Sequence, residues 1–170
     1  GPDGCTVVAG YQPVMGTHLH LQITAPTEAA CRAAEAAALD EAVRLQGLFT
    51  VFDPASPLCR WRSGADERLP AEVRDLLAVA ADGQTRTGGA FNVRTAVLTR
   101  RWLQATSDGV EPSDGELAAL AASIAAPPYE VDDGTVRRLA DSSGVDLNAI
   151  AKVHIADLVA HRLLTERGAT

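Results

Sequence analysis

The sequence predicts an α+β fold, in which helices pack on one face of a small antiparallel sheet. Residues 17–24 alternate apolar and polar side chains, with Leu19, Leu21 and Ile23 on the same face, which is typical of a strand buried on one side. Later alanine-rich segments repeat apolar residues at helical spacing. Strand-like segments stand before and after the main helical ones, and this order indicates the α+β class.

Two strands open the chain. The stretch TVVAGYQPVMGTHLHLQIT, residues 6–24, reads as a pair of strands that meet at Gly16, where glycine permits the backbone of a turn. A helix is expected to begin near Thr27, whose hydroxyl suits an N-cap, and to run towards Gly47.

The middle of the chain combines helices with connections. Residues 48–61, LFTVFDPASPLCRW, are expected to form a connection because two prolines interrupt them. A second main helix should follow Pro70, and a helical insertion is expected around Leu98–Trp102 and Leu117–Ile124. The apolar face of the second main helix comprises Val73, Leu76, Leu77 and Ala80.

The C-terminal part predicts a second hairpin and a closing helix. TVRRLADSSGVDL, residues 135–147, reads as two strands with their turn at Ser142–Gly144. The last helix should begin near Ala149 and carry on one face Ile155, Leu158, Val159 and Leu163. Together these elements are expected to form a single domain, residues 1–170.

Composition and charge exclude several classes of partner. The chain has 170 residues, of which 46% are apolar and 22% charged, as in a globular domain with a real core. Its net charge of -7 argues against a nucleic-acid surface, and the basic pairs Arg100–Arg101 and Arg137–Arg138 are expected on solvated faces. No apolar run reaches membrane-spanning length, and no signal peptide is visible. Cys5, Cys31 and Cys59 form no close or metal-binding pair.

Two adjacent glycines, in TRTGGAFNVRT at residues 85–95, raise the question of what needs bare backbone there. Glycines at the end of a helix permit positive φ and a close approach to the backbone. Taken alone, Gly88 and Gly89 are explained as a helix C-cap, since the stretch is neither a GxGxxG fingerprint nor a Walker loop. Three other stretches change this interpretation: PVMGTHLHLQI, LFTVFDPASPLCRW and VDLNAIAKVHIADLVA.

In their order and spacing, the four stretches resemble the N-terminal half of the FAD:protein FMN transferases, the ApbE-type flavin transferases. That family has Met-Gly-Thr near its start and then a Ser/Thr-x-Tyr/Phe-Asp-x-x-Ser segment. It continues with Thr-Gly-Gly-Ala-Phe-Asp/Asn and a downstream Trp, followed by a Leu-Gly/Asn-Gly/Ala-Ile-Ala-Lys helix start. The resemblance covers nearly the whole chain and implies a β2α2β2-like unit, normally paired with a second one.

By that resemblance the four motifs surround FAD. The implied FAD-binding residues are Met15, Phe52, Gly89, Ala90, Phe91, Asn92, Asn148, Ala149, Ile150 and Lys152. Backbone N–H groups at a helix N-terminus suit a pyrophosphate, and Lys152 would add a positive charge there. Met15 and Phe52 offer apolar surface for a ring system. Read singly, these two are equally well core residues and Lys152 a surface lysine; their combination indicates a site.

The chain departs from the family pattern at several positions near these motifs. Val153 and His154 stand where the family has a glycine and an aromatic residue. Asn92 occupies a position that is Asp in many members, and Arg62 one that is commonly Asn. Such changes indicate a subgroup of the family.

The magnesium ligands expected for the family are missing from this chain. The family's second half carries Gly-Gly-Asp, Thr-Ser-Gly, His-Ile-x-Asp-Pro and Ala-Asp-x-x-x-Thr segments, and none of them follows Lys152. Flavin transfer moves a phosphoryl group whose charge a metal ion offsets. We therefore expect the chain alone to be inactive. The other half should come from a missing segment, a partner chain or self-association through exposed sheet edges.

The histidines give an independent hypothesis. His18 and His20, at i and i+2 on a strand, point the same way, as metal-binding pairs do. His154, Asp157 and His161 share a face of the last helix. If the two faces met, a zinc site could form. His18 and His20 lie opposite the aliphatic strand face, however, which favours exposure to solvent.

The function that the resemblance implies is transfer of FMN from FAD to a Thr or Ser hydroxyl of a target protein, with release of AMP. A non-catalytic flavin- or protein-binding module of the same fold is the first alternative, and a zinc-binding protein is the second. The family often acts outside the cytoplasm, but the sequence itself assigns no compartment.

Overall fold

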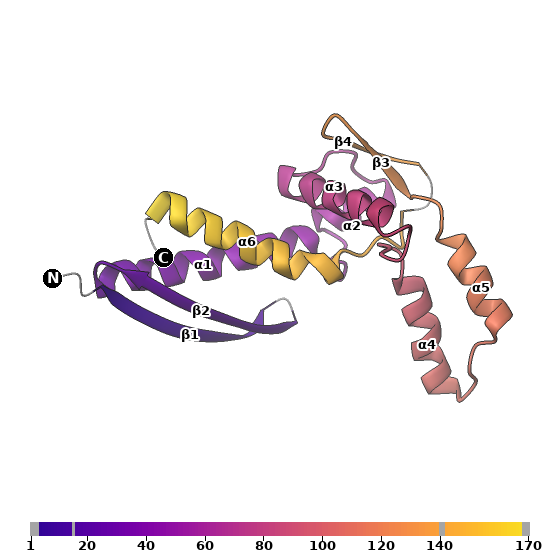
Figure 1. The fold of residues 1–170 in the computed structure, drawn as a ribbon, viewed down its shortest axis with the longest axis horizontal. Helices are drawn as coiled ribbons and strands as arrows, with labels where there is room; N and C mark the ends of the chain where they lie inside the picture. Colours follow the sequence, from indigo (N-terminus) through magenta and orange to yellow (C-terminus); the bar gives the residue numbers. More distant parts are fainter. Residues whose placement is uncertain (1–3, 15, 140–141, 168–170) are drawn as a thin grey trace. The chain divides into compact units, whose positions relative to one another are not determined.

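The structure is a computed structural model that describes residues 4–14, 16–139 and 142–167 (Figure 1). Over these residues it has six helices and two antiparallel sheets of two strands each, so the predicted α+β class is confirmed. The chain divides into two compact units, one made of Gly1–Leu48 with Ala151–Thr170 and the other of Phe49–Ile150. Whether these units behave as the single predicted domain stays a prediction.

The first unit is built on the predicted N-terminal hairpin. Its elements are β1 (Cys5–Val14), β2 (Thr17–Ala25), most of α1 (Glu28–Phe49) and most of α6 (Asn148–Arg167). Strands β1 and β2 pair antiparallel, with Cys5 opposite Ala25 and Tyr11 opposite Leu19. Ile23 is 4% exposed on the inner face, whereas His18, His20 and Gln22 are exposed on the other, which confirms the predicted alternation.

Helix α1 lies on the inner face of this hairpin. The thiol of Cys31 donates to the backbone carbonyl of Cys5 at 2.9 Å, and the Tyr11 hydroxyl donates to Glu35 Oε1 at 2.6 Å. The Tyr11 hydrogen bond is the main cause that lowers the pKa of the Glu35 carboxyl. Alanines on the buried face of α1 have small side chains, which permits close approach between helix and strands.

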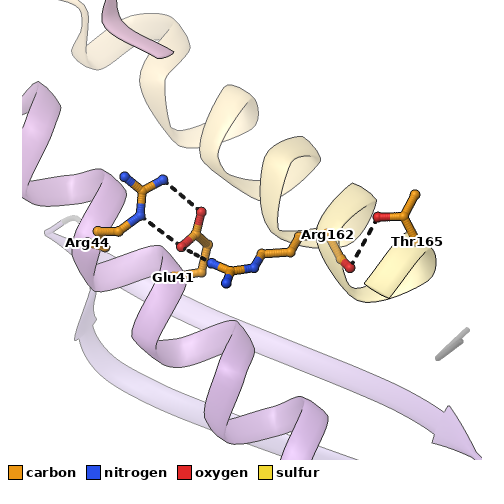
Figure 2. A network of polar contacts seen from close by, with 4 residues as sticks. All are labelled: Glu41, Arg44, Arg162 and Thr165. Carbon is orange, nitrogen blue, oxygen red and sulfur yellow. Dashed lines mark hydrogen bonds and ion pairs between the residues drawn. The ribbon is translucent and has the colours of Figure 1, made fainter. Parts of the chain in front are cut away.

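A carboxylate ties α1 to α6 inside the first unit. Figure 2 shows Glu41 between two arginines of the two helices. Arg44 donates from Nε and a terminal nitrogen, both at 2.9 Å, and Arg162 donates to Glu41 Oε2 at 2.5 Å. The hydrogen bonds from Arg44 and the charges of both arginines lower the pKa of the Glu41 carboxyl, against the desolvation that would raise it. Sequence periodicity gave no sign of this contact because its partners lie 121 residues apart.

Helix α6 has a buried apolar face inside the first unit, as predicted. Ile155, Val159 and Leu163 are buried on α6, and the predicted Leu158 is half-buried beside them. A cavity of about 340 Å³ is lined by β2 from Leu19 to Ile23 and by this face of α6. No helix of the described residues is long and apolar enough to cross a membrane.

The second unit is mainly helical. Its elements are α2 (Pro57–Ser63), α3 (Ala71–Arg86), α4 (Ala96–Asp108), α5 (Asp114–Ser123), β3 (Tyr129–Asp132) and β4 (Thr135–Arg138). Helix α3 matches the prediction, with its expected apolar face buried. Trp61 of α2 packs edge-on against Tyr129 at 5.7 Å between ring centroids. The Tyr129 hydroxyl donates to the backbone carbonyl of Leu77 at 3.0 Å, which joins β3 to α3 in one core.

Helix α2 shows that the predicted connection over residues 48–61 was wrong in its second half. Pro57 begins the helix instead of preventing it, because proline lacks only an N–H that the first turn leaves unused. Ser56 is the N-cap, and its hydroxyl accepts from the backbone N–H of Cys59 at 3.1 Å. Leu58 and Trp61 are fully buried, so tertiary packing also stabilises this short helix.

The second hairpin differs from its prediction in partner and turn. Residues Thr135–Arg138 do form a strand, but β4 pairs with the preceding segment β3 and not with residues after Ser142. The turn is Asp133–Gly134, with φ of 43° and 72°. An Asp-Gly pair at positive φ matches the twist of a tight hairpin, and this signal was overlooked. Ser142 is instead buried, and its hydroxyl donates to the backbone carbonyl of Arg62.

Candidate functional site

One cavity of the second unit gathers residues from three of the four motifs. It has a volume of about 490 Å³, within the usual range for small-ligand sites. Its walls come from the segment after α1, from α2, from the turn before α4, from α4 itself and from the start of α6. Five of the residues implied by the resemblance line it: Phe52, Phe91, Asn92, Asn148 and Ala149.

The paired glycines end α3 and turn the chain towards the cavity wall. Gly88 and Gly89 have φ of 59° and 88°, and a Cβ at either position would meet nothing within 4 Å. Both glycines therefore serve the backbone conformation, and no other described protein atom approaches them closely. The Thr87 hydroxyl accepts from the backbone N–H of Phe91 at 2.9 Å, which fixes the turn that brings Phe91 to the cavity.

Asn92 lines the cavity and forms hydrogen bonds through both polar atoms of its side-chain amide. It is 8% exposed, and its Nδ2 donates to the backbone carbonyl of Ile124 at 2.8 Å. Its Oδ1 accepts from the backbone N–H of Arg94, also at 2.8 Å. A carboxylate in this place would accept the second bond but could not donate the first. The fold therefore requires an amide rather than a carboxylate at this position.

The start of α6 is capped by a carboxylate. Asp146 Oδ1 accepts from the backbone N–H of Asn148 at 2.8 Å, and Oδ2 accepts from the Asn148 side chain at 3.3 Å. The Asp146 N–H donates to the backbone carbonyl of Val93 at 2.8 Å, so this segment is tied to the turn before α4. The carboxylate of Asp146 therefore lies at the N-terminus of α6, where the sequence analysis expected a pyrophosphate.

Two arginines that were not predicted as site residues also line the cavity. Arg62 belongs to α2 and Arg100 to α4. The signal for Arg62 was its departure from a common Asn. Arg100 is exposed, as predicted, but its pair with Arg101 was interpreted only as solvated surface.

The remaining predicted residues do not line this cavity. Gly89 and Ala90 are exposed in the adjoining turn, and Ile150 is half-buried on α6. Lys152 is exposed on α6 and belongs to the first unit. Met15 lies outside the described residues.

The zinc hypothesis is wrong for the described part of the chain, which includes all four histidines. No group of three or more His, Cys, Asp and Glu side chains in that part could hold a metal ion. His18 and His20 stack with ring centroids 6.3 Å apart on the exposed face of the hairpin. His161 is exposed on α6, and no metal-binding group of the described residues combines it with His18 and His20.

Sequence comparison decides the family. The sequence model of the ApbE family matches residues 15–170. The chain belongs to the ApbE family. No curated protein sequence matches it.

Solved structures of ApbE proteins share the fold. The flavin transferase ApbE from Vibrio cholerae has a TM-score of 0.78 at 21% identity, over 98% of this chain and 55% of its own. The ApbE protein of Thermotoga maritima has a TM-score of 0.75 at 19% identity, over 98% and 55%. The apo flavinyl transferase ApbE of Pseudomonas stutzeri has a TM-score of 0.72 at 20% identity, over 97% and 57%. This ApbE-family chain thus spans a little over half the length of the solved structures it matches.

Proposed function

We propose that the cavity of the second unit holds part of FAD, and that the chain is the FAD-binding part of a flavin transferase. One observation carries the proposal: motif residues separated by up to 97 positions, from Phe52 to Ala149, line one cavity. Membership of the ApbE family and the flavin-transferase names of the similar structures support it.

The cavity wall has the chemistry that a flavin nucleotide needs. Phe52 is 87% exposed and stands at the cavity, where an aromatic face is available to a ring system. Phe91 offers a second aromatic side chain. The cationic groups Arg62 and Arg100 suit phosphate. An apolar platform next to positive charge fits a dinucleotide better than it fits a neutral metabolite.

The reaction proposed for the complete enzyme transfers FMN to a Thr or Ser of a target protein. The hydroxyl oxygen attacks the FMN phosphorus, the bond to the AMP phosphate breaks, and the hydroxyl proton and AMP leave. Magnesium would offset the phosphate charge, but the described residues provide no cluster of ligands for it. We infer that this chain binds the flavin nucleotide and does not complete the transfer alone.

The rest of the site would be supplied by further protein. The hairpin β1–β2 is a two-stranded sheet, so each of its strands has paired on one side only within the described residues. Such edges accept additional strands. A C-terminal half like that of the longer relatives, a partner chain or a second copy would fit this role, besides the target protein itself.

Titration with FAD tests the proposal, with flavin fluorescence as the readout. We expect wild-type protein to bind FAD, and Phe52→Ala to weaken binding about tenfold, as for the loss of an aromatic contact worth about 1–1.5 kcal/mol. Val79→Ala is the matched control, because Val79 is exposed in the same unit but does not line the cavity. Absence of FAD binding, or equal loss in both variants, would overturn the proposal.

A covalent-transfer assay separates the enzyme from the non-catalytic binding module. Incubation of the chain with FAD, magnesium and an acceptor peptide containing Thr should leave the peptide unlabelled. The same mixture should yield FMN-peptide once a C-terminal half like that of the longer relatives is added as a second chain. Labelling by the chain alone would show that our inference about incompleteness is wrong, while leaving FAD binding intact.

A further inference from the structure

Two arginines, Arg62 and Arg100, line the cavity of the second unit. Neither Arg62 nor Arg100 forms an ion pair with a carboxylate of the described residues. The neighbouring Arg101, by contrast, pairs with Glu116 through Nε at 2.5 Å. In a chain of net charge -7, two unpaired cations at one cavity mark it as a site for an anion.

The guanidinium of Arg62 is only partly satisfied by the protein. One terminal nitrogen donates to the backbone carbonyl of Ser143. Its Nε is buried and has no acceptor among the described residues. Guanidinium carries five N–H donors, and a buried donor without an acceptor costs about 1–3 kcal/mol. A ligand with several acceptor oxygens would complete this arrangement.

The cavity is also lined by a carboxylate, which caps the start of α6. Asp146 is the one carboxylate among its described lining residues, and both oxygens accept hydrogen bonds from Asn148 at the start of α6. A phosphate placed at that helix end would meet the charge of Asp146. A phosphate placed at the arginines would meet two positive charges instead.

We propose that Arg62 and Arg100 hold the phosphate groups of the nucleotide, and that the N-terminus of α6 does not. The identity of the nucleotide rests on the function proposed above, but the anion site itself does not.

Two ligands test this inference by calorimetric titration at low salt: inorganic pyrophosphate and FAD. We expect Arg62→Gln and Arg100→Gln each to weaken binding of both ligands about tenfold, the usual scale for one charge-assisted hydrogen bond. Arg62→Lys keeps the positive charge and should recover part of the affinity for pyrophosphate. Arg74→Gln is the matched control, because Arg74 is exposed on α3 and does not line the cavity.

The outcomes separate this inference from the function on which it builds. Arginine-dependent binding of pyrophosphate without binding of FAD would support the anion site and refute the FAD assignment. Binding of FAD and pyrophosphate with unchanged affinity in Arg100→Gln would refute the anion site and keep the FAD assignment. Arg100 is exposed, and its side chain forms no hydrogen bond or ion pair with another described residue. If Arg62→Gln fails to fold, the Arg100→Gln result therefore still decides the question.

Discussion

At the scale of single residues, Glu41 is a buried carboxylate of the first unit that two arginines contact. Its side chain is 9% exposed and accepts hydrogen bonds from Arg44 and Arg162. Burying a carboxylate is unfavourable unless it is paired in this way. The contact therefore fixes how α6 is placed along α1 inside the unit.

Glu41→Gln should destabilise the protein by about 1–2 kcal/mol at pH 7, because charge-assisted hydrogen bonds become neutral ones. The pKa of Glu41 is lowered in the folded protein. Its contribution to stability is thus fully present above the unfolded pKa of about 4.3 and is lost as the pH falls through the folded pKa. Urea unfolding followed by circular dichroism should show a smaller acid-induced loss of stability in Glu41→Gln. The exposed neighbour Asp40 provides the control Asp40→Asn, and an equal effect of both changes would contradict this role.

Asn92 gives a second prediction at this scale. Asn92→Asp replaces the donor to the Ile124 carbonyl with a carboxylate oxygen that faces it. We expect a loss of about 1–3 kcal/mol in the free energy of unfolding at neutral pH, since a buried acceptor loses its donor. The loss should shrink at a pH low enough to protonate the new carboxyl, which can then donate. Unchanged stability at pH 7 would mean that the hydrogen bond to Ile124 contributes nothing.

At the scale of elements, the turn after α3 depends on glycine for its backbone conformation. Gly89→Ala should cost about 1–2 kcal/mol because an L side chain is strained at φ of 88° although space is open. Gly47→Ala in α1 also adds a Cβ into open space, but in a helix, where alanine is preferred by up to about 1 kcal/mol. Thermal unfolding should move in opposite directions for the two variants. A stabilising effect of Gly89→Ala would show that the turn tolerates ordinary residues.

The elements also show how far sequence reasoning reaches. Strand alternation in residues 17–24 and helical spacing in α3 predicted both elements, because each pattern reports one buried face. Helix α2 was missed because proline was interpreted only as a helix breaker, and the β3–β4 pairing because its Asp-Gly turn was overlooked.

The candidate site, like the fold, could be predicted only in part from the sequence. Motif resemblance predicted Phe52, Phe91 and Asn148 as FAD-binding residues, since they occur in recognisable strings, and all three line the cavity. It could not find the cap of Asp146 on α6 or the buried contacts of Asn92, which depend on segments brought together by folding. Arg62 and Arg100 were missed because a lone arginine has no pattern until a cavity surrounds it.

At the scale of the whole molecule, the two units should respond differently to the nucleotide. A ligand that binds only the folded protein stabilises it by about 2.7 kcal/mol at a concentration 100 times Kd. The cavity lies in the second unit, so FAD should slow hydrogen exchange of amides in Phe49–Ile150 more than in the hairpin β1–β2. Mass spectrometry of exchanged peptides measures this. Equal protection of both segments would indicate stabilisation without a local site.

Backbone amide shifts on addition of FAD, measured by NMR, most directly test the proposal that the cavity of the second unit binds the nucleotide. We expect the largest changes at Phe52, Arg62, the segment 91–103 and the start of α6 at Asn148. A cavity between β2 and α6 in the first unit provides the internal comparison. Changes concentrated there, or an unperturbed spectrum at saturating FAD, would contradict the assignment of the second-unit cavity as the nucleotide site.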